Sequence, residues 1–134
     1  MPSQLQPPYL NTPLSQVVSL DAGFVLTVVN ALAAGGSGTA NSQIFTVPEE
    51  FGTGGSTLTL TAVPNGGVTT VTVDIEVSTD GGTTWQKKHV GVALIASSVS
   101  TQAAEPNLQS GMLYRINPTT VTGGTSVTIN ATAN

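Results

Sequence analysis

Two acidic side chains on one predicted strand have the spacing that acid–base chemistry would need. Asp74 and Glu76 alternate with apolar residues, so they share a strand face and lie about 7 Å apart by the rise of an extended chain. A glycosidase could use two carboxyl groups at that separation. Lys87 and Lys88 follow on the next predicted strand, and cross-strand pairing of opposite charges explains the same residues without catalysis. We favour charge pairing on a solvated face.

Other catalytic groups are sparse. His89 is the only histidine, so a serine–histidine–aspartate relay would depend on this one ring. The chain has no cysteine, which excludes disulfide bonds and thiolate metal sites. Glu49 and Glu50 are adjacent and would point apart in an extended segment. There is no phosphate-binding loop or dinucleotide fingerprint. The sequence therefore predicts no catalytic site, no metal and no cofactor.

One turn between predicted strands carries a motif, which reads Ser78-Thr79-Asp80-Gly81-Gly82-Thr83-Thr84-Trp85. It resembles the Asp box of sialidases and other glycan-processing propellers, where the box is a β-hairpin turn. The resemblance implies that Asp80 accepts hydrogen bonds from loop amides. It also implies that Gly82 adopts a conformation other residues resist, and that Trp85 anchors the hairpin to the core.

Sialidase activity is not implied by this motif. That family repeats the box around a propeller and needs an arginine cluster and a tyrosine nucleophile. This chain has one box, a single arginine (Arg115) and 134 residues in all. We interpret Ser78, Asp80, Gly82, Thr84 and Trp85 as a structural hairpin.

The composition indicates a folded protein with an unusually uncharged surface. Charged residues make up 7% of the chain, against roughly 25% in ordinary domains, and the formal net charge is −4. The only basic cluster, residues 87–89, is too small to neutralise phosphates, so nucleic-acid binding is not expected. A surface with so few charges offers little repulsion between copies, which suits a subunit of an assembly.

The first 14 residues are predicted to form an extended arm, because four prolines interrupt them. Tyr9, Leu10 and Leu14 could anchor this arm on a neighbouring subunit. No secretory signal is visible at the N-terminus, and the longest apolar stretches are far shorter than a membrane span. Residues 15–134 are expected to form a single domain.

The most apolar predicted strand is Gly23 to Leu32. Phe24, Leu26 and Val28 lie on one face, and Val25 and Val29 on the other. A strand with two apolar faces is typical of a core position, and it could also form a subunit contact. A short helix is the alternative for this stretch. We expect a homo-oligomer, with a trimer favoured.

Alternating apolar residues predict the remaining strands, with Gly-rich turns between them. These strands are Gln16–Leu20, Gln43–Val47, Ser56–Val63, Val68–Thr79, Thr84–Ile95, Gly111–Asn117 and Thr125–Ala133. The turn at residues 64–67 predicts a hairpin of the strands on either side, and Asp80–Gly82 predicts a second hairpin. In the predicted strand Thr84–Ile95, Val90, Val92 and Leu94 are expected to face inward. Residues 96–110 are interpreted mainly as a loop. The pattern predicts an antiparallel β-sandwich, Ig-like or jelly-roll-like, of about seven to nine short strands.

Two segments also resemble small β-sandwich structural proteins of tailed bacteriophages. They are Val73–Trp85 and the ending from Ser110 to Ile129, which carries Gly111-Met112-Leu113-Tyr114-Arg115 before the turn at Gly123-Gly124. The resemblance covers roughly residues 56–132. It implies a non-enzymatic virion component assembled in the host cytoplasm. The type favoured is a capsid decoration or cement protein, whose partner would be the major capsid protein.

Two alternatives remain open. The first is a minor tail, fibre or baseplate protein of the same kind of virion. The second is a carbohydrate-binding module, in which an exposed aromatic side chain stacks on sugar rings. Trp85 and Tyr114 are better explained as core residues, so a glycan is the less favoured ligand.

Overall fold

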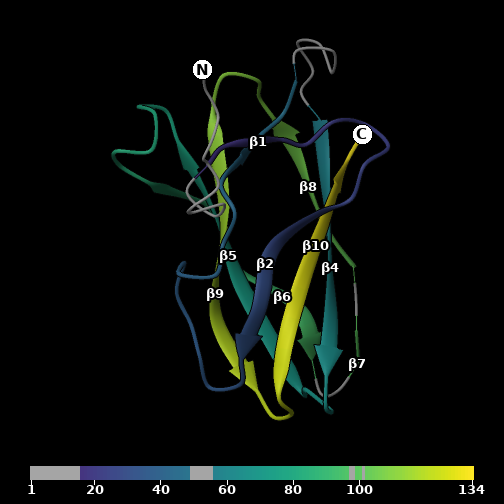
Figure 1. Ribbon diagram of the computed structural model, residues 1–134. Coiled ribbons are helices and arrows are strands. Elements are labelled where there is room, and N and C mark those ends of the chain that lie inside the picture. The colour runs from purple at the N-terminus through teal and green to yellow at the C-terminus, as the bar shows by residue number, and fades with distance from the viewer. Residues whose placement is uncertain (1–15, 49–55, 97–98, 101) are drawn as a thin grey trace, which may run out of the picture.

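The computed structural model describes residues 16–48, 56–96, 99–100 and 102–134, which form two curled β-sheets packed face to face (Figure 1). The six-stranded sheet has, in spatial order, β1 (Val18–Ser19), β3 (Phe45–Thr46), β9 (Leu113–Thr122), β5 (Thr70–Ser78), β6 (Gln86–Ala96) and β7 (Val99–Ser100). The four-stranded sheet has β2 (Leu26–Ala33), β10 (Ser126–Ala133), β4 (Ser56–Asn65) and β8 (Gln102–Leu108). The predicted all-β sandwich is confirmed.

The strand order is that of a jelly roll. If β1 and β7, the two outermost strands of the six-stranded sheet, are set aside, eight strands remain, among which β3 is only two residues long. Numbered along the chain, they form one sheet in the order 1-8-3-6 and the other in the order 2-7-4-5. All neighbours among these eight strands are antiparallel. This is the arrangement of double-sheet jelly rolls.

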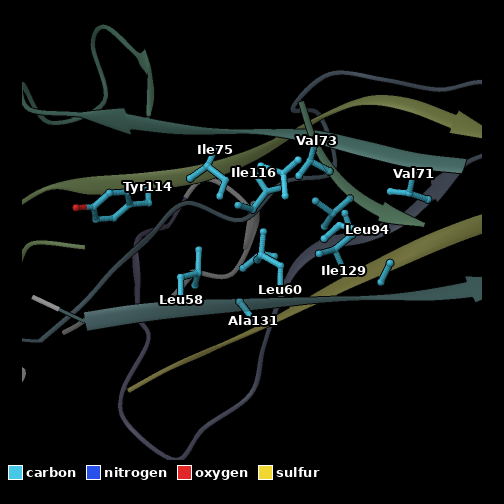
Figure 2. Close-up of a cluster of buried hydrophobic side chains, with 14 of the residues drawn as sticks. Leu58, Leu60, Val71, Val73, Ile75, Leu94, Tyr114, Ile116, Ile129 and Ala131 are labelled. Carbon is cyan, nitrogen blue, oxygen red and sulfur yellow. The ribbon is translucent and has the colours of Figure 1, made fainter. Parts of the chain in front are cut away.

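The core lies between the sheets and is built from the alternating apolar positions of each strand. Val71, Val73 and Ile75 of β5 face Leu58 and Leu60 of β4 across the sandwich (Figure 2), and all five are at most 1% exposed. Tyr114, predicted as a core residue, is buried in this core and packs against Phe45 with ring centroids 5.9 Å apart. Because aromatic residues are few, Val, Leu and Ile make up most of the described core residues.

The hairpin predicted around residues 64–67 is wrong. β4 and β5 lie in different sheets, and β4 pairs instead with β10 and β8. A Cβ on Gly124 would lie 2.7 Å from the amide nitrogen of Val68 and 2.9 Å from the carbonyl oxygen of Gly66. The β4–β5 and β9–β10 connections therefore pack against each other, and both cross from one sheet to the other. Alternation along two strands fixes which face is buried but does not say whether the strands lie side by side.

The predicted loop at residues 96–110 contains two strands, the short β7, which pairs with β6, and β8, which pairs with β4. Its inward positions hold Ala103 and Glu105, and a register shift separates these from the buried Leu108, so the apolar alternation was hidden. Pro106 is compatible with the position of β8 at the edge of its sheet, where a missing donor is tolerated. The second predicted hairpin, of β5 with β6, is present.

The stretch predicted to be buried on both faces is instead an edge strand, β2. Val28 and Val29 are fully buried, and the register against β10 shifts on both sides of Val29. Ala31, which lies in the second shift, has a φ of 48°. Phe24 and Val25 precede the strand and are 65% and 67% exposed. The apolar run thus divides into a buried part and an exposed part. The part of the chain that the structure describes forms no helix that could cross a membrane.

Candidate functional site

The charged residues of β5 lie on the outer face of the six-stranded sheet, but they are not solvated. Asp74 and Glu76 are only 4% and 6% exposed, which contradicts the predicted solvated face. Side chains of the two neighbouring strands cover the carboxylates of Asp74 and Glu76. β6 contributes Lys87, and β9 contributes Arg115 and Asn117. We call these five residues the outer-face cluster.

Asp74 is held from the β6 side of the cluster. Lys87 Nζ donates to its Oδ2 at 2.6 Å, and the amide of Gly91 donates to its Oδ1 at 3.0 Å. The register of β6 against β5 shifts between Val92 and His89, and Gly91 has a φ of 73°. This bulge directs a backbone N–H at the carboxylate. It also leaves Val90 62% exposed, which corrects the prediction that Val90 faces inward.

Glu76 is held mainly from the β9 side. Arg115 Nε donates to its Oε1 at 2.6 Å, and Asn117 Nδ2 donates to its Oε2 at 2.9 Å. Lys87 Nζ lies 3.7 Å from the same Oε2. Both carboxylate oxygens are therefore paired. The cross-strand charge pairing predicted for these strands is present.

Trp85 borders this cluster. It is partly exposed and is not a core residue, contrary to the prediction. The Arg115 guanidinium carbon lies 4.2 Å from the centroid of the Trp85 ring, a cation–π distance. The indole thus covers the arginine that pairs with Glu76, and the motif turn is joined to the outer-face cluster instead of the core.

The electrostatics of the cluster oppose acid–base catalysis by its carboxyl groups. The hydrogen bond from Lys87 lowers the pKa of Asp74 in spite of partial burial. Burial raises the pKa of Glu76, but hydrogen bonds from Asn117 and Arg115 outweigh that effect and leave the pKa lowered. A glycosidase needs one carboxyl group with a raised pKa to act as the acid. Both groups here are ionised at neutral pH, so the pair has two anions and no acid.

The motif turn between β5 and β6 is held by side-chain hydrogen bonds. Asp80 Oδ1 accepts from the amides of Thr83 and Thr84 at 3.1 and 2.9 Å, and Oδ2 accepts from the Thr84 hydroxyl at 2.5 Å. The Ser78 hydroxyl donates to Asp80 and accepts from the amide of Gly82, whose φ is 95°. These bonds, the Thr84 hydroxyl first, lower the pKa of Asp80 to about 2. Asp80 is thereby occupied in fixing the turn.

A second ionic contact joins the two sheets at their edges. Glu105 of β8 is 9% exposed, and its Oε1 lies 2.6 Å from Nδ1 of His89 on β6. Lys88 Nζ lies 3.3 Å from Oε2 of the same carboxylate. Glu105 was missed by the sequence reasoning because β8 was interpreted as a loop. With this contact, all three basic residues of the chain are engaged in ion pairs.

The predicted interface residues divide between described and undescribed parts of the chain. Tyr9, Leu10 and Leu14, with the predicted arm, lie outside the described residues. Phe24 and Val25 are exposed, Leu26 is partly buried, and Val29 belongs to the core. Within the described ranges, the large apolar side chains left exposed are Val17, Phe24, Val25, Val63, Val90 and Val99.

Among the described residues, no three histidine, aspartate or glutamate side chains gather in a group that could hold a metal ion. Comparisons of the chain with protein-family models, with curated proteins and with solved structures find no match. The function must therefore be argued from the chain itself.

Proposed function

We propose that this chain is a non-enzymatic structural protein of a tailed-bacteriophage virion. Specifically, it would be a capsid decoration or cement protein that binds the assembled head lattice. Its partners would be other copies of itself and the major capsid protein. By binding only the assembled lattice, it would stabilise that lattice through mass action.

The observation that carries this proposal is how the charges are distributed. Lys87, Lys88 and Arg115 all form ion pairs. Their partners are Asp74, Glu105 and Glu76, respectively. Among the described residues, what remains for contact is mainly a surface of Thr, Ser, Asn and Gly with exposed Phe and Val side chains, and its acidic groups outside the ion pairs are Asp21 and Asp80. A surface with little net repulsion suits close packing of many copies. Jelly rolls are also used by viral coat proteins, which is support by analogy of fold alone.

The test begins with the genes on either side of this one. We expect a major capsid gene among them, and purified protein should sediment with particles assembled from that capsid protein. It should also raise the temperature at which those particles release their contents. Particles with no bound protein would contradict the proposal. Binding to purified tails instead of heads would replace it with the tail or fibre alternative.

The carbohydrate-binding alternative is favoured by one observation, the partial exposure of Trp85. Its ring is available to solvent in part, although Arg115 occupies one face. If the protein binds glycans through this ring, Trp85→Ala should abolish retention on polysaccharide affinity gels. Tyr114→Phe is the matched control, because Tyr114 is buried and cannot reach a sugar. The decoration proposal expects no retention of either protein.

A further inference from the structure

The connection between β4 and β5 begins with the one asparagine–glycine pair of the chain, Asn65-Gly66. In such a pair the backbone nitrogen of the glycine can attack the side-chain carbonyl of the asparagine, because glycine has no side chain to hinder the approach. Every other asparagine that has a following residue is followed by one with a side chain. The covalent chemistry of the chain therefore favours position 65.

The structure leaves this pair free to react. Asn65 is the last residue of β4, it is exposed, and its side chain makes no hydrogen bond to the described residues. The attack requires the peptide plane between Asn65 and Gly66 to turn toward the side chain. Within the described ranges one hydrogen bond holds that plane, from the Thr125 amide to the Asn65 carbonyl at 2.8 Å. Because bonds at the end of a strand open more easily than those in its middle, the plane can turn while β4 stays folded.

A second turn with a similar pair, Asp80-Gly81, is protected by its geometry. An aspartate can form the same ring with the next backbone nitrogen, but only when its carboxyl group is neutral and can lose water. The carboxylate of Asp80 accepts hydrogen bonds from Ser78, Thr83 and Thr84. These bonds, the Thr84 hydroxyl first, lower its pKa to about 2, so it is ionised at neutral pH. One turn is thus clamped and unreactive, and the other is open.

We propose that Asn65 is a site of spontaneous deamidation in the folded protein. Hydroxide from the solvent removes the amide proton of Gly66, and the nitrogen forms a bond to Cγ of Asn65. The Cγ–Nδ2 bond breaks, and ammonia leaves with a proton from water. A second attack, by water, opens the resulting succinimide ring. Opening at Cγ gives aspartate, and opening at the backbone carbonyl carbon gives isoaspartate; in total one water is consumed and one ammonia released.

The isoaspartate product would disturb the place where the two connections between the sheets pack together. Its backbone runs through the former side chain and is longer by one carbon. A Cβ on Gly66 would lie 2.7 Å from Oγ1 of Thr125, and a Cβ on Gly124 would lie 2.9 Å from the carbonyl oxygen of Gly66, so there is no room for an added atom. The aspartate product keeps the backbone length and adds only a negative charge. This inference does not depend on the proposed virion role.

Peptide mass spectrometry of aged protein tests the site. The full chain is kept in mildly alkaline buffer, both folded and, as a positive control, in urea. A protease that cuts after aspartate and glutamate releases residues 51–74, in which Asn65 is the only asparagine and glutamine is absent. In the folded sample this peptide should gain about 1 Da, the change from an amide to a carboxyl group, before any other asparagine is modified. Asn65→Gln is the matched control, because glutamine would need a larger ring, and its peptide should keep its mass.

Two outcomes would overturn the proposal. The first is an unchanged peptide in the folded sample over the time in which the urea sample is fully modified, since folding would then protect Asn65. The second is modification of another asparagine before Asn65 in the folded sample.

The effect on packing has a separate readout. Anion exchange separates the aged protein with the added charge, and the protease distinguishes its two products because it does not cut after isoaspartate. The isoaspartate-containing fraction should unfold at a lower urea concentration than the variant Asn65→Asp, which has the same charge and an ordinary backbone. Equal midpoints would overturn the inferred effect on packing.

Discussion

Replacing Arg115 by methionine tests the ion pair at the centre of the outer-face cluster. Glu76 is 6% exposed, and it would lose its 2.6 Å partner while remaining charged. Breaking a buried ion pair on one side costs about 3–5 kcal/mol. Asn117 at 2.9 Å and Lys87 at 3.7 Å still compensate part of that charge. We therefore expect a loss of about 2–3 kcal/mol in the free energy of unfolding, near the range for a hydrogen bond to a charged group.

The loss should depend on pH in a defined direction. The pKa of Glu76 is lowered in the folded protein, so its contribution to stability is present above the ordinary pKa of 4.5 and declines as the pH falls through the folded value. Without Arg115 the folded pKa rises, and the difference between variant and natural protein should shrink below pH 4.5. At neutral pH the melting temperature should fall by roughly 10 °C for a domain of this size.

The assay is urea unfolding of both proteins from pH 3 to pH 7. The double variant Glu76→Gln/Arg115→Met is the control, because it removes the buried charge together with its partner. It should be more stable at pH 7 than Arg115→Met alone. A difference below about 1 kcal/mol at pH 7, or one that does not change with pH, would refute this account of the cluster.

Three further predictions follow from the turns and from Trp85. Thr84→Val should raise the pKa of Asp80 from about 2 toward its ordinary 3.8, because the Thr84 hydroxyl donates the bond with the largest effect; carboxyl NMR titration measures this, and an unchanged pKa would contradict it. Gly124→Ala should cost about 2 kcal/mol more in chemical unfolding than Gly35→Ala, since both have positive φ but only the former meets backbone, at 2.7 Å; equal costs would mean that the two connections do not pack closely. Arg115→Met should increase quenching of Trp85 fluorescence by acrylamide, because the guanidinium covers one face of the ring, and unchanged quenching would argue against that contact.

The local structure of this protein could be predicted from its sequence because it depends on neighbours along the chain. Alternation along β5 and β10 identified the inward positions, and Val71, Val73, Ile75, Val127 and Ile129 are all buried. The hairpin of β5 with β6 was predicted because a short turn with glycine leaves the chain few ways to continue. The all-β fold followed from the same signals.

The candidate site was predictable only in part. Asp74, Glu76 and Lys87 could be placed on neighbouring strands from the turn between them. Arg115 and Asn117 lie about forty residues further along the chain and join the cluster through the pairing of β9 with β5. The bulge at Gly91, which turns an amide toward Asp74, could not be predicted from the alternation of apolar residues along β6.

What the sequence by itself determined is the inward face of the regularly alternating strands, such as β5 and β10, and where the chain turns. Only the tertiary structure decided which strands are neighbours. The β4–β5 turn reads as a hairpin, yet it crosses between sheets, because β10 occupies the place beside β4. The pairing of β10 with both β2 and β4 likewise leaves β2 as the last strand of its sheet, a position that its apolar sequence did not predict. Which strands pair depends on the relative stability of all possible pairings in the chain, so it cannot be derived from the residues of one segment alone.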